Sequence, residues 1–216
     1  MDINRLVEEK NGGRPIKVVA NLPYYITTPI IMGLFESRVP LKSITIMVQK
    51  EVADRMAAAV GTKNYGAYTV KLGLYAEPVS RFAVGPGNFF PPPRVDSAVI
   101  RLNRRVPLMA DGAPASPEVI AAAALMADAA FTNRRKTIAN SCKTYFSGRG
   151  SLSLGIAGSS AGEGAPSLAL PEGAAIAERL AAIFDAAAID PRRRGETLTQ
   201  QEFLALGAAL LKVTAA

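Results

Sequence analysis

The sequence predicts an α/β domain built on a mixed sheet, followed by a small domain made only of helices. The first half alternates short strand-forming runs with stretches that carry apolar residues at helical spacing. A segment rich in proline and glycine then interrupts the chain, and the second half is helical and rich in alanine. The predicted boundaries are 1–104 for the sheet domain, 105–117 for a linker and 118–216 for the helical domain, with a flexible insert at about 147–171.

The elements of the first half follow from local patterns. Strand-forming runs lie at 16–20, 43–49, 79–84 and 97–102. Helical stretches lie at 28–38, 50–60 and 67–75. The connection between the last two strands is too short for a helical crossover, so we expect them to form an antiparallel or mixed end of the sheet. In the second half, Ser116-Pro117 predicts a helix start, and Thr199-x-x-Glu202 matches a capping box that opens the last helix.

Composition excludes several classes of protein. The chain has 216 residues, of which 49% are hydrophobic and 20% are charged, so it can bury a sizeable core. It has no histidine, which argues against hydrolases that use a catalytic triad and against most metalloenzymes. The single cysteine, Cys142, excludes an internal disulfide, and its helical spacing from Ile138 is typical of a small core residue. We therefore expect no metal site.

Charge and hydropathy limit the partners. No apolar run approaches the roughly 18 residues of a membrane span, and the first residues lack the pattern of a signal peptide, so we expect a cytoplasmic monomer that does not bind membranes. The net charge of +7 and the pI near 9.7 favour a polyanionic partner, nucleic acid above all. Excess charge that serves solubility alone is the alternative explanation.

The segment Asn21-Leu22-Pro23-Tyr24-Tyr25 has the composition of a binding site. It follows the strand at 16–20, and ligands of open α/β sheets bind at the carboxyl ends of strands. The Asn21 amide oxygen accepts from an amine, Pro23 stiffens the turn, and the two tyrosines offer flat rings for stacking. These groups suit an aromatic ring that bears an amine. A plain turn with an Asn cap and buried tyrosines is the alternative.

The loop GPGNFFPPPR at 85–94 is the second candidate binding segment. Its three consecutive prolines hold the chain extended, so Phe89 and Phe90 can form a fixed aromatic wall. A proline-stiffened connector whose phenylalanines are buried explains the same residues without a ligand.

Two basic clusters mark the helical half. The segment 133–149 contains five basic residues and no acidic residue, and aromatic residues flank it. A second cluster follows Asp190-Pro191. A solvated helix surface is one interpretation, and contact with RNA phosphates is the other. The residues proposed for RNA contact are Arg134, Arg135, Lys136, Lys143, Arg192, Arg193 and Arg194.

Three motifs carry a family resemblance. NLPYYI at 21–26, FFPPPRVDSAVIRL at 89–102 and FTNRRKTIAN at 131–140 occur in the order found in ribosomal RNA adenine dimethyltransferases of the kasugamycin-sensitivity type, which this chain resembles from Ile16 to about Leu211. The resemblance implies the C-terminal half of a Rossmann-like class I methyltransferase domain. Only 15 residues precede the first strand, so we expect the glycine loop and the acidic residues that bind most of the cofactor, S-adenosyl-L-methionine, to lie upstream.

The resemblance also implies roles for single residues. Family members transfer methyl groups from S-adenosyl-L-methionine to the exocyclic amine of adenine. By analogy, Asn21 and the carbonyl of Leu22 or Pro23 would accept the amine hydrogens, and Asn21 would lie near the methionine end of the cofactor. Tyr24 would stack on one face of the flipped base, and Phe89, or alternatively Phe90, on the other. The basic helices would contact small-subunit rRNA in a preribosomal 30S particle.

Three functions are consistent with these patterns. The first is a partial form of a 16S rRNA adenine N6,N6-dimethyltransferase that acts on adjacent adenines during ribosome biogenesis. The second is a noncatalytic RNA-binding protein of ribosome assembly that keeps the substrate face. The third is an erythromycin-resistance-type or DNA adenine methyltransferase. The NLPYY, PPPRVDSAV and NRRKT segments argue against this third function, because they resemble the housekeeping rRNA branch more closely.

Overall fold

The computed structural model describes residues 3–37, 39–149, 151–154, 167–169 and 175–215. They form two compact units. The sheet unit comprises Met1–Ala58 and Tyr75–Arg105, and the helical unit comprises Ala59–Leu74 and Val106–Ala216. The segment 59–74 therefore belongs to the helical unit, although it lies between two strands of the sheet in the sequence.

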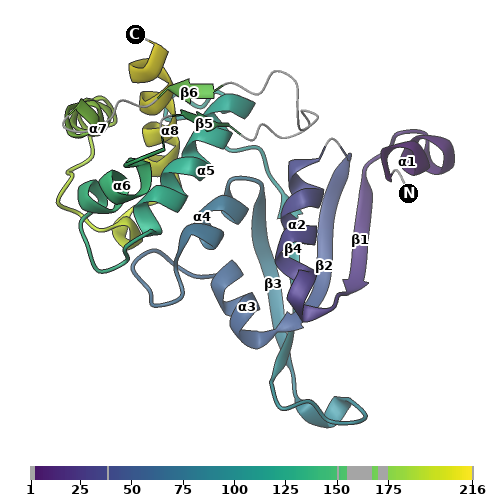
Figure 1. Cartoon of the computed structure of the whole chain (residues 1–216). Helices are drawn as coiled ribbons and strands as arrows, with labels where there is room; N and C mark the ends of the chain where they lie inside the picture. The colour runs from purple at the N-terminus through teal and green to yellow at the C-terminus, as the bar shows by residue number, and fades with distance from the viewer. Residues whose placement is uncertain (1–2, 38, 150, 155–166, 170–174, 216) are drawn as a thin grey trace. The chain divides into compact units, whose positions relative to one another are not determined.

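A four-stranded mixed sheet forms the centre of the sheet unit (Figure 1). Its strands are β1 (Ile16–Asn21), β2 (Leu41–Gln49), β3 (Ala76–Val84) and β4 (Ser97–Arg104), in the order β1-β2-β4-β3. β1 pairs in parallel with β2, whereas β2 and β3 both pair antiparallel with β4. The carboxyl ends of β1 and β2 and the start of β4 therefore lie at the same end of the sheet.

Short helices precede and connect these strands. They are α1 (Ile3–Asn11), α2 (Thr27–Glu36), α3 (Lys50–Met56) and the 3-10 turns η1 (Tyr24–Ile26) and η2 (Pro86–Asn88). The helix predicted at 50–60 ends at Met56, before the chain turns through Gly61, whose φ of 80° favours glycine. β3 begins at Ala76, earlier than predicted, and includes Pro78. A proline is tolerated there because β3 is an edge strand.

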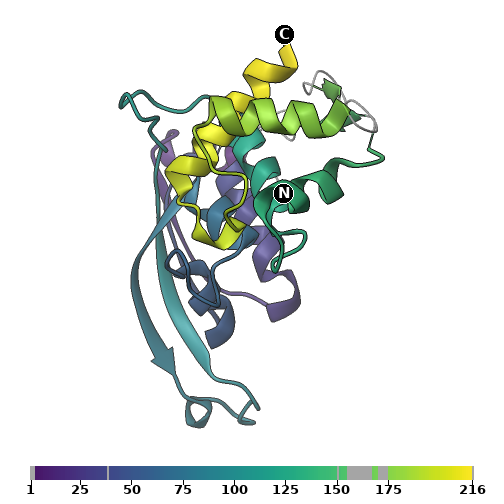
Figure 2. The same cartoon turned by 90° about the vertical axis from the view of Figure 1, so that its left-hand side faces the viewer.

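The faces of β2 differ in burial. Ile44, Ile46 and Val48 alternate along the strand and are each at most 1% exposed, so they belong to the core. Met47 and Gln49 leave the strand on the opposite face and are only half-buried. Figure 2 shows the long β3 and β4 hairpin, whose connecting loop carries η2. The partly open face of β2 and this loop supply the walls of the site described below.

The helical unit contains five α-helices among its described residues. They are α4 (Ala67–Gly73), α5 (Pro117–Phe131), α6 (Ile138–Phe146), α7 (Ala175–Ala186) and α8 (Gln200–Ala215), with the 3-10 turn η3 (Gly195–Thr197) and the short antiparallel pair β5 (Ser151–Ser153) and β6 (Ser167–Ala169). The β5 and β6 strands were not predicted. Most of the insert predicted at about 147–171 lies outside the described residues.

Both predicted helix starts are confirmed. The Ser116 side chain accepts a hydrogen bond from the N–H of Val119 at 3.3 Å. Before α8, the N–H of Thr199 donates to Glu202 Oε2 at 2.8 Å, and the N–H of Glu202 donates to Thr199 Oγ1 at 3.2 Å. Burial raises the pKa of Glu202, but hydrogen bonds from Arg193 and Thr199 outweigh it and hold that pKa below its usual range.

Aromatic residues join the segment 59–74 to the helices. The Tyr65 hydroxyl donates to the carbonyl of Leu198 at 2.8 Å, and burial, with a smaller effect from Glu202, raises its pKa to about 12. The Phe131 ring lies 6.0 Å from that of Tyr65 and 6.2 Å from that of Phe203. Cys142 is fully buried, and burial raises the pKa of its thiol to about 12, so the prediction of a core residue is confirmed.

Candidate functional site

A pocket opens at the carboxyl end of β1. Its volume is about 360 Å³, and Asn21, Leu22, Pro23, Met47 and Phe89 line it. Asn21 is the last residue of β1 and pairs in register with Met47 of β2, so both side chains leave the sheet on the same face. The hairpin loop brings Phe89 to this end of the sheet from a distant part of the sequence. We call this the Asn21 pocket.

The two candidate carbonyls in this turn are not equivalent. The carbonyl of Pro23 accepts from the N–H of Ile26 at 3.2 Å and from the hydroxyl of the buried Thr27 at 3.0 Å. These two donors occupy both lone pairs of that oxygen. No donor among the described residues contacts the carbonyl of Leu22 or the side-chain amide of Asn21. Asn21 and Leu22 therefore keep their acceptor capacity for a ligand, whereas Pro23 shapes the turn.

The aromatic candidates also differ in whether they line the pocket. Phe89 is half-buried and lines the pocket, and its N–H donates to the carbonyl of Pro86 at 3.1 Å, which fixes the start of the loop. Phe90 is fully exposed and does not line the pocket. Tyr25 is 85% exposed, and the side chain of Tyr24 lies outside the described residues. Among the described aromatic candidates, Phe89 is thus the one that forms a wall of this pocket.

Met47 is a lining residue that the sequence did not indicate. It lies inside an ordinary strand-forming run, and only the parallel register of β1 against β2 places it beside Asn21. Alternation along β2 indicates which residues share a face, but the sequence gives neither the partner strand nor its register.

The two basic clusters lie side by side in the helical unit. The N–H of Ile138 donates to the carbonyl of Arg193 at 2.7 Å, and the N–H of Ala139 donates to the carbonyl of Pro191 at 3.2 Å. The turn before α6 and the turn before η3 are therefore joined through their backbones. With the exception of Arg134, we call the exposed basic residues of these turns and of α6 the basic face: Arg135, Lys136, Lys143, Arg192 and Arg194.

Two predicted RNA-binding arginines are tied to other segments of the helical unit. Arg134 Nε lies 2.9 Å from Glu196 Oε2, and the same guanidinium donates to the carbonyl of Thr62 at 3.1 Å. Arg193 pairs with Glu202 and donates to the carbonyl of Thr197 at 2.7 Å. These contacts connect segments of the helical unit, so both arginines have a structural role whether or not they also contact RNA.

The remaining predicted RNA-binding residues are more available. Arg192 pairs with Asp190 at 3.2 Å, and its hydrogen bonds hold the pKa of Asp190 below the usual range. Four of the predicted residues, Arg135, Lys136, Lys143 and Arg194, are exposed and form no ion pair with a described residue. Within the ranges that the structure covers, no three or more acidic or cysteine side chains are placed to hold a metal ion. None of the described helices has the length and apolar character needed to cross a membrane.

Curated relatives match almost the whole chain. It is 43% identical over 206 residues to the "Ribosomal RNA small subunit methyltransferase A" of Lachnoclostridium phytofermentans, and the alignment covers 95% of this chain and 61% of that protein. It is 42% identical over 212 residues to the protein of the same name from Alkaliphilus oremlandii, with 98% of this chain and 63% of that protein covered. The chain thus spans somewhat less than two thirds of the length of these relatives.

Solved structures share the fold. A dimethyladenosine transferase from Plasmodium falciparum superposes with a TM-score of 0.66 at 21% identity, covering 91% of this chain and 67% of that one. The 23S rRNA methyltransferase ErmE superposes with a TM-score of 0.54 at 20% identity, covering 96% and 78%. The predicted methyltransferase-like α/β fold is thereby confirmed. The family model described as "Ribosomal RNA adenine dimethylase" matches residues 2–160, so the chain belongs to the ribosomal RNA adenine dimethylase family.

Proposed function

We propose that this chain binds adenine and RNA for a 16S rRNA adenine N6,N6-dimethyltransferase reaction that uses S-adenosyl-L-methionine. The observation that carries the proposal is the Asn21 pocket, in which two free acceptors and one aromatic ring surround a space of about 360 Å³. The substrate would be adjacent adenines of small-subunit rRNA in a preribosomal 30S particle in the cytoplasm. The relatives named for small-subunit rRNA support this choice of RNA.

The chemistry of adenine explains why these groups suffice. The exocyclic amine is a weak nucleophile because its lone pair is delocalised into the ring. When the side-chain oxygen of Asn21 and the carbonyl of Leu22 accept its two hydrogens, the nitrogen becomes pyramidal and its lone pair is directed out of the ring plane. Phe89 stacks on one face of the flipped base and offsets part of the cost of unstacking. Tyr24 is proposed for the other face.

The pocket fits only part of the methyl donor. S-adenosyl-L-methionine, when bound, supplies an electrophilic methyl group. Asn21 is the only polar side chain among the five lining residues, so the pocket suits a purine and the methyl end of the donor. None of these five described residues supplies a carboxylate for the donor's ribose. We therefore propose that the described residues form the acceptor side of the site and contact the donor through Asn21, and that most of the donor site is not among them.

Methyl transfer is the direct test. The chain is incubated with isotopically labelled S-adenosyl-L-methionine and 30S particles that lack adenine dimethylation, and the digested rRNA is analysed by mass spectrometry. We expect labelled N6,N6-dimethyladenosine, formed at a rate limited by weak donor binding, because the described residues form only part of the donor site. A parallel calorimetric titration with the donor alone measures its binding. If neither label nor donor binding is detected while RNA still binds, the chain has the noncatalytic assembly role instead.

The basic face makes a separate prediction about salt. We expect Arg135→Gln combined with Lys136→Gln to weaken RNA binding and to reduce the slope of log affinity against log salt by about 1.4, because each lost phosphate contact with a single strand removes about 0.7. Fluorescence anisotropy at several salt concentrations measures the slope. Lys10→Gln combined with Lys42→Gln removes the same charge from exposed positions of the sheet unit and should leave the slope nearly unchanged. Equal slopes for both variants would assign the basic face to solubility.

A further inference from the structure

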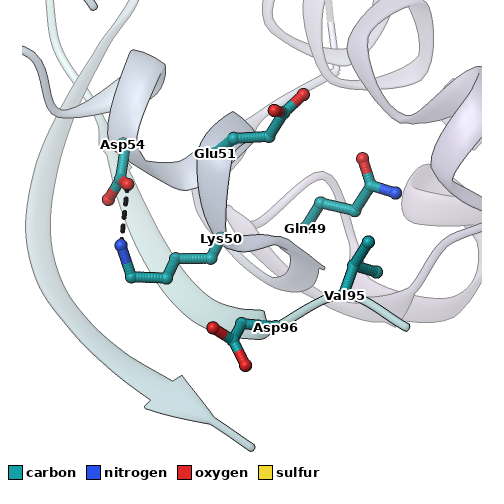
Figure 3. Close-up of a pocket in the computed structure, with 6 residues that line it drawn as sticks. All are labelled: Gln49, Lys50, Glu51, Asp54, Val95 and Asp96. Atoms are coloured by element: carbon teal, nitrogen blue, oxygen red, sulfur yellow. Dashed lines mark hydrogen bonds and ion pairs between the residues drawn. The ribbon is translucent and has the colours of Figure 1, made fainter. Parts of the chain in front are cut away.

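A second pocket lies at the carboxyl end of β2 (Figure 3). Its volume is about 510 Å³, and it is lined by Gln49, Lys50, Glu51, Asp54, Val95 and Asp96. We call it the Gln49 pocket. None of its residues belongs to the Asn21 pocket, and the function proposed above gives them no role.

The two pockets are neighbours on one face of the sheet. Met47 lines the first and Gln49 lines the second, and these residues follow each other at alternate positions on β2, so their side chains share a face about 7 Å apart. The loop before β4 borders both, with Phe89 at the first pocket and Val95 and Asp96 at the second. Successive nucleotides of an extended single strand can span this separation, so one RNA strand can occupy both pockets.

The cation of the Gln49 pocket is already paired. Lys50 Nζ lies 3.0 Å from Asp54 Oδ2, and Arg81 pairs with the same carboxylate. These two cations hold the pKa of Asp54 below its usual range, with the hydrogen bond from Lys50 as the largest cause. Figure 3 shows Lys50 extended toward Asp54 and away from Gln49. None of the described residues that line the pocket therefore offers an unpaired positive charge with which to bind a phosphate.

The groups left for a ligand are mainly acceptors. Gln49 is half-buried, and no described residue hydrogen-bonds to its side-chain amide. Asp96 is fixed by its backbone carbonyl, which accepts from the N–H of Lys50 at 2.9 Å, while its carboxylate forms no ion pair with a described residue. Glu51 is only loosely paired with Arg55, at 3.8 Å. Val95, 40% exposed, adds an apolar wall.

We propose that the Gln49 pocket binds the base next to the target adenine and selects bases that carry an exocyclic amine. A flat, uncharged ring can lie against Val95, and its amine can donate to the Gln49 and Asp96 side-chain oxygens. The Asp96 carboxylate can only accept, so it distinguishes the amine of cytosine or adenine from the carbonyl at the same position of uracil, which it repels; the Gln49 oxygen accepts the second hydrogen of the amine. The inference rests on the proposed function, because it needs the adenine to occupy the Asn21 pocket.

Short RNA strands test this selectivity. The probe is a fluorescein-labelled RNA of about nine nucleotides, within the usual length of a single-strand site, with one adenine in a uridine background. In two further probes, cytidine replaces the uridine on the 5′ or the 3′ side of the adenine. Cytosine and uracil differ at this edge by an amine in place of a carbonyl. We expect one of the two cytidine probes to bind the wild-type chain about tenfold more tightly than the uridine probe.

Variants connect the preference to the pocket. Gln49→Leu keeps the size of the side chain and removes its acceptor, and Asp96→Asn removes the carboxylate; we expect each to reduce the cytidine preference to about twofold or less. Removing a negative charge also strengthens RNA binding in general. Glu77→Gln makes the same charge change at an exposed position of β3 outside the pocket, and its preference should match that of the wild type. Circular dichroism checks that each variant is folded.

A fourth probe separates this inference from the function on which it rests. Here uridine replaces the adenine itself. If the wild type prefers the adenine probe but binds the cytidine and uridine neighbours equally, the Gln49 pocket is not a base site, and the proposed function stands. A cytidine preference that survives in both Gln49→Leu and Asp96→Asn also overturns the inference. If the wild type does not distinguish adenine from uridine at the target position, it is the proposed function that fails.

Discussion

Asn21→Ala is expected to lower the rate of methyl transfer by about 10²–10³-fold, the usual cost of removing one aligned hydrogen-bonding group from a transition state. Among the described residues that line its pocket, Asn21 has the only polar side chain, so none of their side chains can replace its acceptor. RNA affinity should fall by no more than about tenfold, far less than the rate, since it comes mainly from phosphate contacts. The measurements are label incorporation into 30S particles and anisotropy with a labelled RNA strand.

A binding comparison tests the same role without catalysis. RNA that carries purine ribonucleoside in place of adenosine lacks the exocyclic amine, so the wild-type chain should bind it more weakly. This preference should be smaller in Asn21→Ala, in which only the Leu22 carbonyl still accepts from the amine. Asn64→Ala, at an exposed turn of the helical unit, is the control for an asparagine replaced elsewhere. If Asn21→Ala keeps both the methyl transfer and the preference for adenine, Asn21 is not the amine acceptor.

The local part of this site could be predicted from the sequence, and the pairing of distant parts could not. Asn21, Leu22 and Pro23 occupy a single turn after an apolar strand, so their placement follows from neighbouring residues. Met47 requires the register between two strands. The distinction between the carbonyls of Leu22 and Pro23 requires the hydroxyl of Thr27, whose position depends on the 3-10 turn that the sequence did not indicate.

The basic clusters could also be predicted only in part. Runs of arginine and lysine predicted a basic surface, and the exposure of Arg135 and Lys136 agrees with it. The sequence could not show that Arg134 pairs with Glu196 or that Arg193 pairs with Glu202, because ion pairs depend on which turns the fold brings together. Counting basic residues therefore overestimates the number that are free to bind phosphate.

The close packing of two helices gives the largest expected effect on stability. Gly207 lies in α8 against α5, and a Cβ atom at this position would lie 2.6 Å from the backbone nitrogen of Ala123 and 2.7 Å from the carbonyl oxygen of Val119. Backbone atoms cannot rotate away, so the helices would have to separate. We expect Gly207→Ala to lower the free energy of unfolding of the helical unit by about 2 kcal/mol, as overpacked cores do. Urea denaturation followed by circular dichroism measures the change.

The same substitution at Gly33 is the matched control, because it isolates helix propensity from packing. Gly33 lies inside α2, and nothing lies within 4 Å of an added Cβ atom there. Alanine at an open helical position loses less backbone entropy than glycine does on folding, so Gly33→Ala should raise the free energy of unfolding of the sheet unit by about 0.5–1 kcal/mol. Opposite signs at the two positions are the expected result. A gain at both would mean that α5 and α8 can move apart at little cost, and Gly207 would then not be required by the contact between them.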